Sequence, residues 1–218
     1  MSSRAIPPRL YANTDTALQK REATASISSI VSEKVSTFAR QLAESAGRAE
    51  ARERELTRSV LGSVAQRIGE QIFGLEYHRT MGRYHDQRPD TTDPELLERA
   101  RLATEYVEKP LERGSNLKNP FQGLSRDQLN LIIYDDAGPY TKNERHAAFC
   151  EVCNIETKWN QKVMRIYDIE AAQMISNRPN FCIEVLSHLR NLPLIEQVQY
   201  PDNYESRLEA RINETPEK

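Results

Sequence analysis

Side chains able to carry acid–base chemistry are most concentrated between residues 134 and 153. The adjacent Asp135 and Asp136 are followed by Glu144 and His146. General acid–base catalysis uses carboxyl and imidazole groups whose surroundings set their pKa values apart. If the chain is an enzyme, these four residues are the candidates for its catalytic site.

A structural interpretation of the same segment fits its spacing better. Thr141-Lys-Asn-Glu144 has the pattern of a capping box, which starts a helix. Gly138 stands six residues before Glu144, as glycine and glutamate do in a calcium-binding loop, but that register puts Ile133 at the first ligand position. An apolar side chain supplies no ligand oxygen, so the sequence favours helix ends and a sharp turn over a calcium site.

Histidine and cysteine residues of the last third could in principle hold zinc. His146, Cys150 and Cys153 share one face of an expected helix, and Cys182 with His188 follows on the next one. Zinc sites take four such ligands in a tetrahedron, but this spacing matches no standard zinc finger or ribbon. The sequence therefore predicts no cofactor and keeps zinc as an alternative. Three cysteines also make no disulfide framework, which indicates a reducing compartment.

Composition and periodicity predict an all-α fold. The chain is 28% charged and has only 8 glycines in 218 residues, which favours helices with wide solvated faces over tight β-turns. Residues 14–80 show apolar side chains at spacings of three and four, so we expect long amphipathic helices there, as a hairpin or as one rod. A hairpin is favoured because each apolar stripe alone is too narrow to be stable in water.

The remaining boundaries follow from helix breakers and caps. Residues 1–13 contain Pro7 and Pro8 and are expected to form a disordered tail. The polar residues 81–92 are interpreted as a linker to a compact helical bundle over 93–212, with a tail at 213–218. The expected anchors of the bundle core are Trp159 and Phe181.

Charge and hydropathy exclude several classes of partner. The formal net charge is -2 and no basic stripe is visible, which disfavours nucleic acid. No apolar run approaches the length that spans a bilayer, and the N-terminus lacks the apolar core of a cleavable secretory signal. The amphipathic run at 56–75 has a polar face of mixed sign, which disfavours a membrane surface.

Two further features indicate a bacterial origin. The stretch from Asn119 to Gly138, with Thr141 to Ala148, resembles a helical module in bacterial proteins of unassigned function. The first 50 residues are serine-rich and have no acid before Asp15. This composition is typical of the leaders of proteins that bacterial type III machinery exports. We therefore expect a location in the bacterial cytoplasm or export by a Sec-independent, type III-like route.

The sequence thus predicts a non-enzymatic interaction protein, with a secreted effector as one version. It would bind a protein partner or a second copy of itself through the apolar stripes of its N-terminal helices. The residues expected to make that contact are Ile27, Val31, Phe38, Leu42, Leu61, Val64, Ile68 and Ile72. The alternative is an enzyme or metal-dependent protein with its site around residues 134–153.

Overall fold

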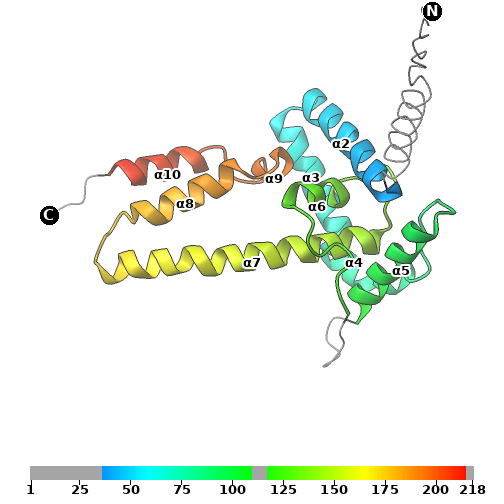
Figure 1. The fold of residues 1–218 in the computed structure, drawn as a ribbon. Helices are drawn as coiled ribbons and strands as arrows, with labels where there is room; N and C mark the ends of the chain where they lie inside the picture. Colours follow the sequence, from blue (N-terminus) through cyan, green and yellow to red (C-terminus); the bar gives the residue numbers. More distant parts are fainter. Residues whose placement is uncertain (1–35, 110–116, 215–218) are drawn as a thin grey trace, which may run out of the picture.

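The computed structural model describes residues 36–109 and 117–214, and every regular element in these ranges is helical (Figure 1). This confirms the predicted all-α class for the described part of the chain. The elements are α2 (Thr37–Glu55), α3 (Arg58–Phe73), α4 (Leu75–Thr80), the 3-10 helix η1 (Met81–Tyr84), α5 (Pro94–Glu108), α6 (Arg126–Ile133), α7 (Lys142–Ala172), α8 (Pro179–Arg190), α9 (Leu194–Gln197) and α10 (Tyr204–Asn213).

The helix starts follow the capping signals of the sequence. Both expected capping boxes are present, at Ser125 for α6 and at Thr141 for α7. Asp93 accepts hydrogen bonds at the start of α5, and Pro94 occupies the first helical position, where a missing N–H costs nothing. Local chemistry therefore sets where these helices begin.

The N-terminal helices pack on the rest of the chain. The helix breaks at Leu56 and Thr57, so residues 37–73 do not form one rod. α2 lies mainly on α6, while α3 lies on α7 and reaches α9. Residues 14–35, where the expected helices would begin, fall outside the described residues.

One apolar core joins both sides of the expected linker at 81–92. Ile68 and Ile72 of α3 belong to the same buried cluster as Ala103 of α5 and Ile132 of α6. The linker, which includes η1, therefore does not separate two cores. We call this part of the molecule, from α2 to the first half of α7, the body.

A helical arm extends from the body. It consists of the second half of α7 with α8 and α10, and α8 lies between the other two (Figure 1). Its own buried cluster is small, with Cys182, Leu186 and Leu208. We expected Trp159 to anchor the bundle core. It does not, because α7 has left the body at this point. The Trp159 ring instead stacks on His188, with 3.8 Å between ring centroids.

Candidate functional site

The two adjacent aspartates of the candidate catalytic group are bound to arginines of distant helices. Asp135 is buried, and its Oδ2 lies 2.6 Å from Nη2 of Arg48 and accepts a 2.7 Å hydrogen bond from Ser45 Oγ. Burial disfavours its charged form, but these two partners hold the pKa of Asp135 below its ordinary value. Asp136 lies 2.8 Å from Nη2 of Arg67. Both carboxylates therefore fix α2 and α3 to the loop before α7.

Glu144 and His146 also have structural partners. Glu144 is fully buried, accepts a 2.8 Å hydrogen bond from Nε of Arg99 and closes the capping box of α7. Nδ1 of His146 lies 2.6 Å from the carbonyl oxygen of Ile72, and a carbonyl only accepts, so this nitrogen carries the proton. The imidazole also stacks on Tyr77. Each of the four candidates thus engages a different part of the body.

We expect two partly buried histidines, His146 and His188, to make the fold less stable in acid. Burial lowers the pKa of both His146 and His188. The unfolded chain takes up these protons near pH 6.5, whereas the folded chain resists them. The stability they contribute is therefore complete above pH 6.5 and is lost as the pH falls through their folded values.

The midpoint of thermal unfolding, measured at a series of pH values from 7.5 to 5, tests this expectation. His146→Gln removes one titrating group and should make the decline shallower. His85 is exposed, and Glu108 raises its pKa, so its contribution has the opposite sign. His85→Gln is the matched control and should not reduce the acid decline. A His146→Gln profile parallel to that of the parent chain would contradict the assignment.

The four zinc candidates do not converge in the structure. Cys182 lies in the arm cluster with its Sγ 3.7 Å from the carbonyl oxygen of Asn177, whereas His146 faces α3 in the body. Burial raises the pKa of Cys150 to about 11 and also raises that of Cys153, so both favour the thiol over the metal-binding thiolate. Over residues 36–109 and 117–214, no three His, Cys, Asp or Glu side chains are grouped to hold a metal ion.

Most residues expected to bind a partner are covered by the chain itself. Leu61, Ile68 and Ile72 are buried in the body core. Phe38, Leu42 and Val64 are partly buried against it, and Ile27 with Val31 falls outside the described residues. The apolar stripe of α3 is therefore not an open surface, because α6, α7 and α9 complete the same core.

An aromatic cleft lies at the base of the arm. It has a volume of about 240 Å³, and its walls come from α7, α8, the start of α10 and the segment before it. The apolar side chains that line it are Trp159, Val163, Met164, Phe181, Val185, Leu189, Tyr200 and Tyr204. Glu156 is its one acidic side chain and His188 its one basic side chain among the described residues. We call this hollow the aromatic cleft.

A second hollow of about 340 Å³ adjoins the aromatic cleft and shares Glu156 and Tyr200 with it. The rings of Phe73 and Phe149 stack at 4.0 Å in its apolar wall. Its polar wall is an ion-pair network in which Arg126 contacts Glu156 and Glu196. Burial opposes the charged form of Arg126, but the hydrogen bonds to both carboxylates keep its pKa above the ordinary value. We call this hollow the charged cleft.

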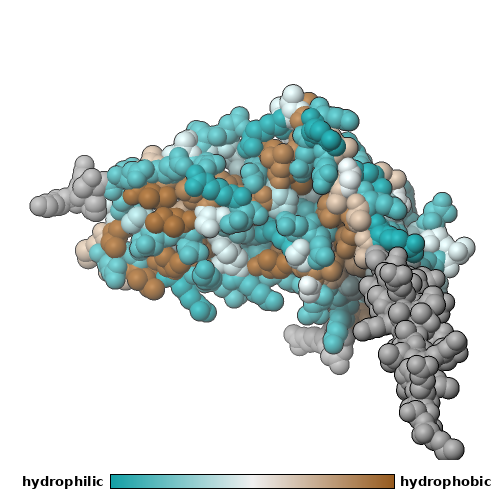
Figure 2. Space-filling model, turned by 45° about the horizontal axis from the view of Figure 1, so that its top comes forward, coloured by the Kyte–Doolittle hydropathy of each residue, from teal (hydrophilic) through white to brown (hydrophobic). Residues whose placement is uncertain are grey.

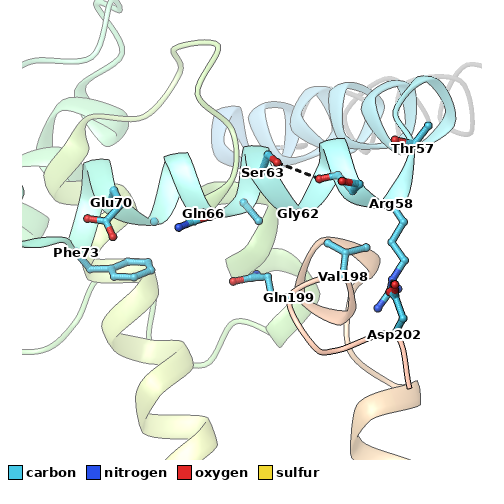
Figure 3. Close-up of a pocket in the computed structure, with 13 residues that line it drawn as sticks. Thr57, Arg58, Gly62, Ser63, Gln66, Glu70, Phe73, Val198, Gln199 and Asp202 are labelled. Carbon is cyan, nitrogen blue, oxygen red and sulfur yellow. Dashed lines mark hydrogen bonds and ion pairs between the residues drawn. The ribbon is translucent and has the colours of Figure 1, made fainter. Parts of the chain in front are cut away.

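A third hollow, of about 770 Å³, runs along one face of α3 (Figure 3). Small side chains line it on α3, among them Gly62 and Ser63, and Val198 with Gln199 faces them across the hollow. An ion pair of 2.8 Å between Arg58 and Asp202 closes one end. This α3 groove is polar along much of its length.

These three hollows were not predicted from the sequence. Their walls combine residues that are far apart in the chain, such as Phe73, Arg126 and Tyr200. The only local signal is that Tyr200 and Tyr204 stand four residues apart. Comparison with known proteins finds no matching family model, no matching curated protein and no matching solved structure.

None of the helices in the described ranges is long and apolar enough to cross a membrane.

Proposed function

We propose that this chain is a non-enzymatic binding protein that docks a protein partner, or a second copy of itself, on its helical arm. One observation carries the proposal: large apolar side chains of the arm stand in solvent. The exposed fractions are 46% for Met164, 58% for Ile169, 92% for Met174 and 48% for Ile183. Figure 2 shows hydrophobic residues in several groups over the arm.

The architecture of the arm supports this role. α8 contacts both α7 and α10, but nothing in the described part of the chain covers the outer sides of these helices along most of the arm (Figure 1). Burying such apolar surface against a partner would contribute about 25 cal/mol per Å². Methionine suits an interface because its flexible side chain adapts to different shapes.

The body supports the non-enzymatic part of the proposal. Asp135, Asp136 and Glu144 are each paired with an arginine that ties separate helices together. A general base needs a free acceptor in reach of a substrate proton. These three carboxylates are engaged in holding the fold, which favours binding over catalysis at residues 134–153.

A bacterial setting remains part of the proposal, with export by a type III-like route as one version. Its support is compositional: the first 50 residues are serine-rich and have no acid before Asp15.

Photo-crosslinking from the arm tests the proposal. A photoreactive amino acid at Ile183 or at Met174, in the full chain expressed in its source cells, should give a discrete adduct. The matched control is Leu75, which is 64% exposed but lies on the body. The adduct mass distinguishes a second copy from another protein.

Surface charge provides the complementary variant. Ile169→Glu should remove the adduct formed from position 183 while leaving the thermal midpoint nearly unchanged, because Ile169 is exposed. Equal adducts from position 75, or none from either arm position, would show that the arm is not the docking surface.

A further inference from the structure

The two clefts at the base of the arm carry more negative than positive charge. Among the described residues that line them, the charged side chains are Arg126, Glu156 and Glu196, with His188 beside them. Arg126 contacts both carboxylates and neutralises only one. The side chains of Glu156 and Arg126 remain 28% and 18% exposed, so the excess charge faces solvent at the mouth of the clefts.

His188 does not supply the missing positive charge at neutral pH. Its Nε2 lies 3.2 Å from Oε2 of Glu156, and its ring is stacked on Trp159. Burial lowers the pKa of His188, so the imidazole is neutral at pH 7. The two carboxylates therefore share one cation in this cluster, and one negative charge is left uncompensated.

Aromatic rings line the same place. Trp159 lines the aromatic cleft, and the rings of Tyr200 and Tyr204 stack 5.3 Å apart beside it. The face of an aromatic ring is negative and attracts a cation within about 6 Å, tryptophan most strongly. The excess carboxylate and these aromatic rings thus favour the same kind of group.

We propose that the aromatic cleft binds an arginine or lysine side chain of the partner, carried on a segment with apolar neighbours. The apolar stem would lie against Val185 and Leu189, and the charged end would meet Glu156 beside Trp159 and Tyr200. A volume of about 240 Å³ is below the range of sites for drug-sized ligands and suits one long side chain. This inference rests on the proposed function and names the chemistry of the partner.

Trp159 makes the proposal measurable on the full chain. It is the sole tryptophan of the sequence and lies in the cleft, so its fluorescence reports an occupant directly. The probes are three blocked tripeptides, Leu-Arg-Leu, Leu-Gln-Leu and Leu-Glu-Leu, titrated at pH 7.5. We expect saturable binding of the arginine peptide with a dissociation constant of about 1 mM and an about tenfold preference over the glutamate peptide.

Glu156→Gln is the diagnostic variant. It leaves Arg126 balanced by Glu196 alone, so the preference for the arginine peptide should fall to about twofold or less. The matched control is Glu184→Gln, which removes an exposed carboxylate paired with Lys162 on the same arm and should keep the full preference. If Glu156→Gln melts early, Glu196→Gln gives the same charge balance and is measured instead.

The outcomes separate this inference from the proposed function. Equal binding of all three peptides would overturn the charge preference but leave apolar docking on the arm intact. Absence of any fluorescence change with all three peptides would overturn the cleft as a side-chain site. The crosslinked adducts from positions 174 and 183 depend on neither peptide result. Only the crosslinking experiment therefore tests the proposed function.

Discussion

Replacing Arg99 by alanine is expected to lower the free energy of unfolding by about 3–5 kcal/mol, because it leaves a buried charge without its partner. Nε of Arg99 donates a 2.8 Å hydrogen bond to Glu144, which is fully buried. Nη2 donates to Gln41 of α2 at 3.0 Å. The guanidinium also lies 4.6 Å from the centre of the Phe38 ring. One side chain thus joins α2, α5 and α7.

Urea unfolding followed by circular dichroism measures this effect, and α5 provides the control. Arg101 lies two residues further along the same helix and pairs with Glu98 and Glu105 on the exposed surface. Arg101→Ala should leave the unfolding midpoint nearly unchanged, since solvent screens such pairs. If both variants shifted the midpoint equally, the buried pair would not be the source of the stability.

The local part of the fold could be predicted from the sequence. Ser125 and Thr141 start their helices through capping boxes, whose partners are three residues apart. The long-range part could not. Arg99 is 45 residues from Glu144 and Arg48 is 87 residues from Asp135, so no local pattern marks either pair. The sequence therefore identifies the acidic side chains of this segment, but it does not identify the arginines that pair with them.

The apolar stripe of α3 shows a second limit of periodicity. A stripe indicates which side chains must be covered, and Leu61, Ile68 and Ile72 are covered. It does not indicate whether the cover comes from the same chain. Of the seven large apolar side chains that stand exposed in the described residues, four lie on the arm, where Met174 stands in a turn and belongs to no helical stripe. Periodicity does not predict the clefts either, because they form only where separate helices pack together.

Replacing Glu170 by alanine is expected to open the arm locally, at a cost of about 2–4 kcal/mol, because partly buried N–H donors lose their acceptor. The first turn of a helix leaves N–H groups unpaired, and Arg178 at the N-cap of α8 offers no side-chain cap. Pro179 has no N–H. Glu170 of α7 accepts from the next two, the backbone N–H groups of Asn180 and Phe181, at 2.9 and 3.0 Å.

Hydrogen exchange of the full chain distinguishes local from global loss of stability. The buried cluster of the arm is small and separate from the body core, so the Glu170 variant should lose protection in α8 and α10 while α3 and α5 keep theirs. Glu184→Ala, which removes an exposed carboxylate on α8, should leave both regions protected. Equal loss in arm and body would mean that they unfold as one unit, and unchanged protection in α8 would mean that Glu170 does not cap this helix. Local opening confined to the arm would show that the proposed docking surface depends on a single carboxylate of α7 that caps the N-terminus of α8.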